Sequence, residues 1–306
     1  MSSTEGHAPV AVLGMGKMGQ ALVGRLLDQG FPLQMWNRSP KDLAEFESRG
    51  AVQLHSLEGL WDHAGVVITF LANDEALANV TIEDGGIVHS GASNRILIDM
   101  STVSPRISAE VAARAEAIGL DYLRSPVSGN PAVLAAGNLT LLVSGPRATF
   151  ERAEALLHAI GPTVLYVGDA EHSRTLKLAI NSGLAITAQL MAELIVFGEN
   201  NGIDRSILLH ALGESVMGSP FVRYKTPGLI DHDYSATFTT NLLIKDLELA
   251  LDVARDASLS LPLIELVNTL THLAATNGYG EIDFAALLPS LQLTLGQSPD
   301  IEPPTS

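Results

Sequence analysis

The sequence predicts an α/β domain with a parallel sheet, joined by a long helix to an all-α C-terminal domain. Two observations support this fold class. In the first half of the 306 residues, short apolar runs alternate with amphipathic stretches, as in strands connected by crossover helices. In the second half, apolar residues recur at helical spacing. We place the domain boundary between residues 1–168 and 169–306.

Four apolar runs in the first half are typical of buried strands, with helical patterns between them. The expected strands are Val10–Leu13, Leu33–Trp36, Val66–Leu71 and Ile96–Met100, and the expected helices include Ala21–Gln29 and Pro40–Arg49. Because strands that alternate with helices are joined by right-handed crossovers, the sheet should be parallel. Two further runs, Thr140–Ser144 and Thr163–Val167, are strand-like but alternate less clearly, and their place in the sheet is left open.

The second half begins with an unusually long helical pattern. From Glu171 to Gly198 apolar residues recur at helical spacing without proline, which predicts a helix of about 40 Å at 1.5 Å per residue. Further helices are expected at Asp204–Leu212, Thr240–Ala257 and Leu261–Ala275. The tail, Gln297–Ser306, contains three prolines and is expected to be frayed.

Composition excludes several classes of protein and site. The 34 Asp and Glu exceed the 18 Lys and Arg, giving a net charge of -16, which argues against non-specific nucleic-acid binding. The absence of cysteine excludes disulfides and thiolate metal sites, and the nine histidines lack metal-ligand spacing, so no metal is expected. The opening MSSTEGHAP has no apolar core, and no uncharged apolar stretch reaches about 18 residues. We therefore expect a cytoplasmic protein without a membrane span.

A glycine-rich loop follows the first expected strand and opens a helix. Gly14, Gly16 and Gly19 form G-x-G-x-x-G in VAVLGMGKMGQAL. The first glycine permits a tight turn, the second lets the backbone approach a pyrophosphate, and the third allows close packing of helix and strand. The free N–H groups of the helix N-terminus favour phosphate. This context predicts a Rossmann domain that binds a dinucleotide, with Met15, Met18 and Leu71 among the contacting residues.

The end of the second expected strand indicates which dinucleotide binds. An NAD site usually has a carboxylate there for the ribose hydroxyls, whereas arginine accommodates a 2′-phosphate. This chain has the neutral Asn37, followed by Arg38 and Ser39, which can donate hydrogen bonds to phosphate. The sequence therefore favours NADP(H), bound in part by Asn37, Arg38 and Ser39.

Further motifs make the chain resemble the β-hydroxyacid dehydrogenases from about Val10 to Leu288. Besides the glycine loop, the motifs are Asp99–Pro105 (DMSTVSP), Ser125–Gly129 (SPVSG), the pair Lys177 and Asn181, and the pair Lys245 and Asp246. The family includes 3-hydroxyisobutyrate dehydrogenase, tartronate semialdehyde reductase and the glyoxylate/succinic semialdehyde reductases. The imine reductases are close relatives that share the fold and the glycine loop.

The resemblance implies roles for residues in the first half of the chain. Thr102 matches the threonine that contacts the nicotinamide side of the cofactor, although Ser104 and Pro105 also predict a helix start there. Ser128 and Gly129 match the loop that holds a substrate carboxylate. The family usually has a second glycine next, where this chain has Asn130 and Pro131. We expect Asn130 to contact the substrate, and this departure leaves the substrate's identity open.

The resemblance assigns the chemistry to the long helix. Lys177 and Asn181 are four residues apart and share a helix face. They match the family's catalytic lysine and its asparagine partner, with Ser128 as a third catalytic residue. A positioned ammonium can stabilise and protonate the alkoxide that forms when hydride reaches a carbonyl carbon. Lys245 is expected near the nicotinamide, and Asp246 near the substrate.

Two enzymatic hypotheses follow, together with one that involves no catalysis. The first is hydride transfer between NADP(H) and a small β-hydroxyacid or its semialdehyde or ketone. The second is an NADPH-dependent imine reductase, which Lys177 disfavours because an ammonium repels a cationic iminium and because imine reductases often have aspartate or tyrosine there. The third is a non-catalytic NADPH-binding protein, against which the intact set of site residues argues. The resemblance also implies a homodimer.

Overall fold

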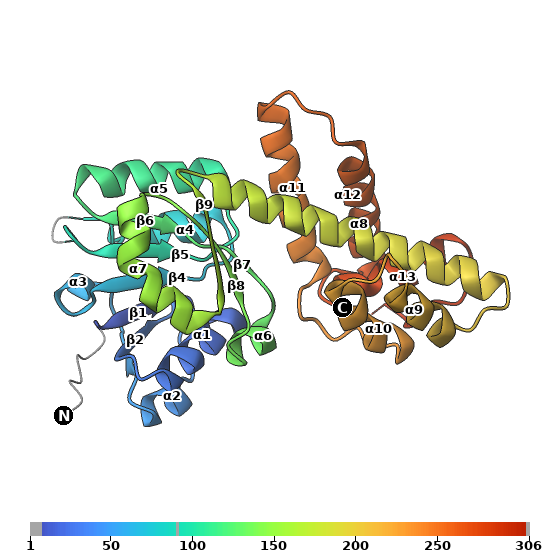
Figure 1. The fold of residues 1–306 in the computed structure, drawn as a ribbon, viewed down its shortest axis with the longest axis horizontal. Helices are drawn as coiled ribbons and strands as arrows, with labels where there is room; N and C mark the ends of the chain where they lie inside the picture. Colours follow the sequence, from blue (N-terminus) through green and yellow to red (C-terminus); the bar gives the residue numbers. More distant parts are fainter. Residues whose placement is uncertain (1–7, 90–91, 304–306) are drawn as a thin grey trace. The chain divides into compact units, whose positions relative to one another are not determined.

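The computed structural model describes residues 8–89 and 92–303. The chain divides after Lys177 into two compact units, Met1–Lys177 and Leu178–Ser306, which are coloured from blue to yellow-green and from yellow to red in Figure 1. The division falls within helix α8 (His172–Asn200). The domain boundary that we place after residue 168 stays a prediction.

In the described residues, the first unit contains a nine-stranded sheet in the order β3-β2-β1-β4-β5-β6-β8-β7, with β9 beside β8. The strands are β1 (Val10–Leu13), β2 (Leu33–Trp36), β3 (Val52–Gln53), β4 (Val66–Thr69), β5 (Ile96–Asp99), β6 (Asp121–Arg124), β7 (Val127–Ser128), β8 (Thr140–Ser144) and β9 (Thr163–Gly168). Neighbouring strands from β3 to β6 are parallel, as predicted. The two runs whose place was left open are β8 and β9, which pair in parallel, while β8 runs antiparallel to β6 and β7.

Helices cover both faces of this sheet (Figure 1). They are α1 (Lys17–Asp28), α2 (Ala44–Ser48), α3 (Leu60–His63), α4 (Asp74–Thr81), α5 (Pro105–Ala117), α6 (Pro131–Ala135) and α7 (Arg147–Ile160). Successive strand residues point to opposite faces. Val10 and Val12 of β1 accordingly pack with α1, α2 and α7, while Ala11 and Leu13 pack with α3, α4 and α5. Burial on both faces explains why the strands read as continuous apolar runs.

Several expected boundaries in the first unit were wrong. The helix expected from Pro40 to Arg49 is confined to α2, because the Asp42 carboxylate accepts a hydrogen bond from Ala44 N at 3.1 Å and so competes with helical backbone bonding at this position. The helix expected to begin at Ala21 begins at Lys17, directly after the glycine loop. The strands expected to reach Leu71 and Met100 end one or two residues earlier.

The second unit is helical, as predicted, and begins within α8. The remaining helices are α9 (Arg205–Glu214), α10 (Pro220–Ile230), α11 (Thr240–Asp256), α12 (Pro262–Ala274), the short η1 (Ala275–Tyr279) and η2 (Phe284–Ala286), and α13 (Leu287–Thr294). Helix α8 has 29 residues, close to the predicted length. Its length and composition alone would suit a membrane span, but half of its most apolar window is buried inside the protein. Burial of this kind is typical of a core helix, which would have the same length and composition.

The described part of the tail is docked rather than frayed, so that expectation was wrong. The Asp300 carboxylate accepts hydrogen bonds from Arg205 Nη2 at 2.8 Å, Tyr234 OH at 2.6 Å and Gln292 Nε2 at 2.9 Å. Burial alone would raise the pKa of Asp300, but these hydrogen bonds outweigh burial and lower it. Tyr279 OH also donates to the carbonyl of Ile301 at 2.9 Å. Residues 1–7, which open the chain, and 304–306 of the tail lie outside the described residues.

Candidate functional site

The carboxyl ends of five strands lie in register at one edge of the sheet. Leu13 of β1 pairs with Trp36 and Thr69, Thr69 pairs with Asp99, and Asp99 pairs with Arg124. The strand order reverses between β1 and β4, which is where open α/β sheets bind ligands. Among the predicted cofactor residues that lie within three residues after these strand ends are Gly14, Asn37, Leu71 and Thr102.

The glycine loop has the backbone geometry that the motif requires. Gly14 has a φ of +102°, and a Cβ there would lie 2.3 Å from the carbonyl oxygen of Phe70. A Cβ on Gly19 would lie 1.9 Å from the carbonyl oxygen of Gly14, whereas a Cβ on Gly16 would meet no atom within 4 Å. Gly16 is the N-cap residue of α1, and in the described chain no side chain caps that N-terminus. The open space at this helix N-terminus fits a pyrophosphate.

Asn37 connects the end of β2 to the glycine loop. Its Oδ1 accepts a hydrogen bond from Met15 N at 3.0 Å, and its Nδ2 donates to the carbonyl of Ser39 at 2.9 Å. Arg38 and Ser39 are exposed beside it, Met18 is half-buried, and the Met15 side chain is fully buried in the core. Asn37 therefore shapes the loop, while cofactor contacts by these residues stay predictions.

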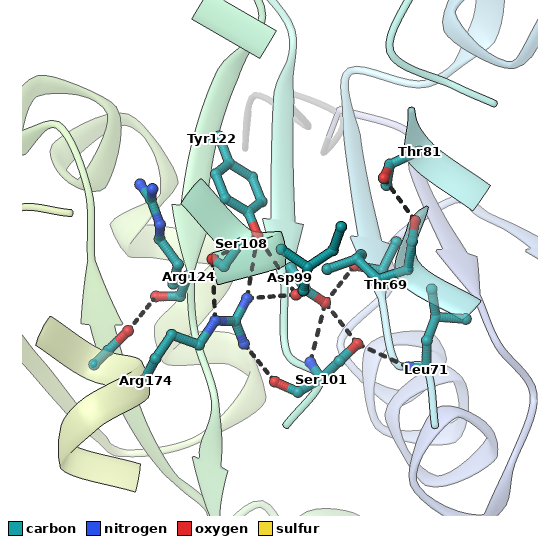
Figure 2. Close-up of polar contacts among 12 residues, drawn as sticks. Thr69, Leu71, Thr81, Asp99, Ser101, Ser108, Tyr122, Arg124 and Arg174 are labelled. Atoms are coloured by element: carbon teal, nitrogen blue, oxygen red, sulfur yellow. Dashed lines mark hydrogen bonds and ion pairs between the residues drawn. The ribbon is translucent and has the colours of Figure 1, made fainter. Parts of the chain in front are cut away.

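A buried polar network occupies the same edge, at the end of β5 (Figure 2). Asp99 Oδ1 accepts hydrogen bonds from Thr69 Oγ1 at 2.7 Å, from Ser101 N at 3.1 Å and from Ser101 Oγ at 2.6 Å. Ser101 Oγ in turn accepts a hydrogen bond from Leu71 N at 2.8 Å. One carboxylate thus fixes the two chain segments that carry Leu71 and Thr102, both predicted to contact the cofactor.

Arg174, near the start of α8, completes this network. Its side chain is 1% exposed, and Nη2 donates to Asp99 Oδ2 and, at 3.1 Å, to Tyr122 OH. Nη1 donates to the carbonyl of Ser101, and Nε lies 3.2 Å from Ser108 Oγ. Burial alone would lower the pKa of Arg174, but the charges of Asp99, Tyr122 and Glu171 and the hydrogen bond to Tyr122 together outweigh burial and raise it. Burial together with the Asp99 charge raises the pKa of Tyr122 to about 12.

Sequence reasoning missed Arg174. It lies in the polar run EHSRTLK at the start of the expected helix, where an arginine is normally exposed. The available signal was Asp99, a carboxylate that ends an apolar strand and must have a partner if it is buried. Nothing in the sequence alone indicates which of the cations is that partner.

The predicted substrate loop joins β7 to α6. Ser128 is half-buried and pairs with Thr140 of β8. Gly129 has a φ of +141°, and a Cβ there would lie 2.7 Å from Leu139 Cδ1. Asn130 Oδ1 accepts a hydrogen bond from Val133 N at 3.0 Å, so this residue caps α6, and the following proline takes the first helical position. The departure from the family pattern therefore builds a helix start, and substrate contact by Asn130 stays a prediction.

The helical unit brings three of the predicted residues together. Asn181 of α8 is 3% exposed, and its Nδ2 donates to Asp246 Oδ2 of α11 at 2.5 Å. Asp246 Oδ1 lies 2.9 Å from Lys245 Nζ. Lys177 is half-buried on α8, one turn before Asn181. Asp246 thus holds the Asn181 amide, and direct contact of Asp246 with a substrate stays a prediction.

Comparison with known proteins identifies the family. Residues 9–168 match the family described as the NAD binding domain of 6-phosphogluconate dehydrogenase. Residues 172–291 match the NAD-binding family of NADP-dependent 3-hydroxyisobutyrate dehydrogenase. The chain belongs to the β-hydroxyacid dehydrogenase family. It is therefore an NAD(P)-dependent oxidoreductase with a dinucleotide-binding domain.

Curated relatives of this β-hydroxyacid dehydrogenase match over nearly its whole length. An uncharacterized oxidoreductase of Bacillus subtilis, YfjR, is 30% identical over 91% of this chain and 98% of its own length. The mitochondrial 3-hydroxyisobutyrate dehydrogenase of Rattus norvegicus is 29% identical over 95% of this chain and 89% of its own length.

Solved structures show the same fold. The 3-hydroxyisobutyrate dehydrogenase of Mycobacterium tuberculosis with L-serine has a TM-score of 0.82 at 25% identity, covering 93% of this chain and 99% of that one. Psf3 in complex with NADP+ and 2-OPP has a TM-score of 0.84 at 26% identity, covering 92% and 99%. An imine reductase from Pseudomonas sp. has a TM-score of 0.60 at 21% identity, covering 93% and 99%. The 3-hydroxyisobutyrate dehydrogenase and Psf3 are thus more similar in fold to this chain than the imine reductase is.

Proposed function

We propose that this enzyme transfers hydride between NADP(H) and a small β-hydroxyacid or its semialdehyde or ketone. The observation that carries the proposal is the Asn181 amide, buried and held by Asp246 on the helix face that Lys177 shares. A cation beside a fixed amide suits a reacting carbonyl oxygen. It suits a cationic iminium less, because the ammonium repels it.

The cofactor proposal rests on the end of β2 and on one solved relative. Arg38 is exposed there and can make a charge-assisted contact with a 2′-phosphate, with Ser39 beside it. The open space at Gly16 suits the pyrophosphate. The similar Psf3 structure contains NADP+. When bound, NADPH supplies the hydride, and Thr102, Leu71 and Lys245 would lie on its nicotinamide side.

The chain's own residues would handle the oxygen and its proton. In the reducing direction the ammonium of Lys177 donates a hydrogen bond to the carbonyl oxygen and protonates the developing alkoxide. Lys177 then regains a proton from water. Because the Asn181 Nδ2 is already bonded to Asp246, its Oδ1 is left to accept a hydrogen bond from the ammonium or from the product hydroxyl.

The substrate's carboxylate would bind at the β7–α6 loop. The Ser128 hydroxyl and the backbone N–H of Asn130 are hydrogen-bond donors, and the left-handed φ of Gly129 turns that backbone. The related Mycobacterium tuberculosis enzyme was solved with L-serine, which is itself a β-hydroxyacid. A carboxylate and an oxygen on a carbon one to three positions along the chain from it therefore define the substrate class.

The test is NADPH oxidation with succinic semialdehyde and with butanal, its analogue without the carboxylate. A charge-assisted hydrogen bond contributes about 1.5–3 kcal/mol, so we expect kcat/KM for the acid to be about 10- to 150-fold higher. Glyoxylate and an activated ketone extend the comparison. Equal kcat/KM for the two aldehydes would contradict carboxylate recognition.

We also propose that the enzyme is a cytoplasmic homodimer without a membrane span. Leu263, Leu266 and Leu273 of α12 are 61%, 55% and 37% exposed and share one helix face. Contiguous apolar surface on a soluble protein usually marks an interface. Sedimentation at micromolar concentration should show a dimer, and Leu263→Glu with Leu266→Glu should shift it to monomer. A compact monomer of the parent protein would contradict the assignment.

A further inference from the structure

The first turn of α8 is attached to the sheet at three points. Arg124 of β6 donates to Glu171, immediately before the helix, with Nε at 2.9 Å. Ser144 of β8 bonds Ser173, with the two hydroxyl oxygens 2.8 Å apart. The third attachment is the ion pair of Arg174 with Asp99 of β5. The first turn of this helix is thus bonded to side chains of three strands.

Arg174 differs from the other two attachments in what it connects. Its guanidinium bonds both the Asp99 carboxylate and the carbonyl of Ser101, the residue before Thr102 (Figure 2). Through the Ser101 hydroxyl the same network reaches Leu71 N. The segments linked in this way carry Leu71 and Thr102, which are both predicted to contact the cofactor, Thr102 on its nicotinamide side.

Arg174 is also one helical turn before Lys177. Residues three apart on a helix are neighbours, separated by about 4.5 Å along the axis and about 60° around it. A change in the rotation of the first turn would therefore displace Lys177 directly. We propose that Arg174 is a positioning residue, which fixes the rotation of α8 so that Lys177 is presented in register with the 99–102 segment.

The chemistry of the pair supports this assignment, which rests on the function proposed above. A guanidinium is a planar fork that can bond two acceptors in a fixed geometry, whereas a lysine ammonium is a point charge without that geometry. The desolvation of a buried ion pair largely offsets its Coulombic attraction, so stability alone is a poor reason for the pair. Fixing the orientation of α8 relative to the Asp99–Ser101 segment is a role that requires the planar, two-acceptor geometry of the guanidinium.

The decisive experiment is a double-mutant cycle of Arg174→Lys and Lys177→Ala, with kcat measured on the best carbonyl substrate at saturating NADPH. A displacement of about 1 Å can cost about 100-fold in rate, so we expect Arg174→Lys to lower kcat by about 10- to 100-fold. NADPH affinity, measured by fluorescence titration, should change by less than about threefold. In the Lys177→Ala background, Arg174→Lys should change kcat by less than about twofold.

Each arm of the cycle tests a different claim. An equal reduction by Arg174→Lys in both backgrounds, or no reduction in the parent, would overturn the positioning role. If Lys177→Ala alone retained parental kcat, the proposed role of Lys177 would fail first, and the positioning role with it. Activity is expressed per folded molecule, determined from the bound NADPH.

A neutral pair keeps the test informative if Arg174→Lys does not fold. Asp99→Asn combined with Arg174→Gln leaves neither member of this pair charged and should also lower kcat by about 10-fold or more. The matched control is Asp300→Asn with Arg205→Gln, the same change in a buried pair on elements without predicted site residues. The control should keep kcat within about twofold. Equal kcat in the two neutral pairs would also overturn the proposal.

Discussion

Each of the two units buries an arginine against an aspartate, and the two pairs join different elements. In the first unit, Arg174 and Asp99 lie at the carboxyl edge of the sheet and hold the start of α8. In the helical unit, Arg205 of α9 and Asp300 hold the C-terminal tail. A buried ion pair of the same type therefore fixes the start of the helix that carries the predicted catalytic residue Lys177 in one unit. In the other unit it holds the C-terminal tail against the helices. What such a pair does is decided by the segments it connects.

The partners of the two pairs show the same difference. Around Asp99 the additional donors are Thr69 and Ser101, in segments that lead to predicted cofactor residues. Around Asp300 they are Tyr234 and Gln292, which belong to the core of the helical unit. Loss of the first pair should thus be seen in turnover, and loss of the second in stability.

The largest effect that we expect concerns the residue that the Arg174 pair positions. Lys177→Ala should lower kcat on a carbonyl substrate by about 10²–10⁴-fold, the usual contribution of a positioned acid. NADPH affinity should barely change, because Lys177 is assigned to the substrate oxygen. Steady-state kinetics and fluorescence titration measure the two quantities. Near-parental turnover of the variant would show that Lys177 is not the catalytic acid, and the Arg174 pair would then have no catalytic residue to position.

The preference for NADPH over NADH should depend on Arg38 at the edge of the sheet, and changing it should leave catalysis by Lys177 unaffected. Arg38→Asp should weaken NADPH binding relative to NADH by about 10- to 150-fold, since a charge-assisted hydrogen bond of about 1.5–3 kcal/mol is replaced by repulsion. The ratio of kcat/KM for the two cofactors measures this. Arg49→Asp, an exposed change in the same unit, is the control. Equal use of both cofactors by the parent protein would contradict the prediction.

The tail pair should affect stability alone. Asp300→Asn should lower the free energy of unfolding by about 1.5–3 kcal/mol at neutral pH, because it removes the charge that Arg205 and Tyr234 bond. The folded-state pKa of Asp300 is lowered, so its contribution is present above the unfolded pKa and is lost as pH falls through the folded one. Urea unfolding at neutral and acid pH tests this prediction. A fall in kcat in Asp300→Asn would contradict the claim that only the Arg174 pair affects turnover.

A smaller effect is expected from Tyr122, which bonds Arg174. Its folded pKa is about 12 against 10.0 unfolded, so folding favours the protonated phenol. That stabilisation is complete below the unfolded pKa and is lost as pH rises towards the folded one, by about 1.4 kcal/mol at pH 11. Urea unfolding at pH 9 and 11 should show a steeper loss in the parent than in Tyr122→Phe. The same slope in both proteins would mean that Tyr122 titrates normally.

The sequence predicted features that depend on local pattern. The strand at Val10–Leu13 is buried on both faces and that at Leu33–Trp36 is buried on one face and half-buried on the other, and both were predicted from their apolar residues. The long helix α8 has helical periodicity throughout. Asn130 followed by proline is an N-cap signal that we did not use. Arg174 and Asp300 were missed because their roles depend on partners 75 and 95 residues away in the chain, which no local pattern reveals.

The central claim is that the enzyme reduces carbonyl groups of small acids, and one measurement tests it most directly. With NADPH and the parent protein, kcat/KM for succinic semialdehyde is compared with that for a five-membered cyclic imine of similar size. Because the Lys177 ammonium favours an alkoxide and repels an iminium, we expect the aldehyde to be preferred by at least about 10-fold. Faster reduction of the imine would contradict the account and make the enzyme an imine reductase.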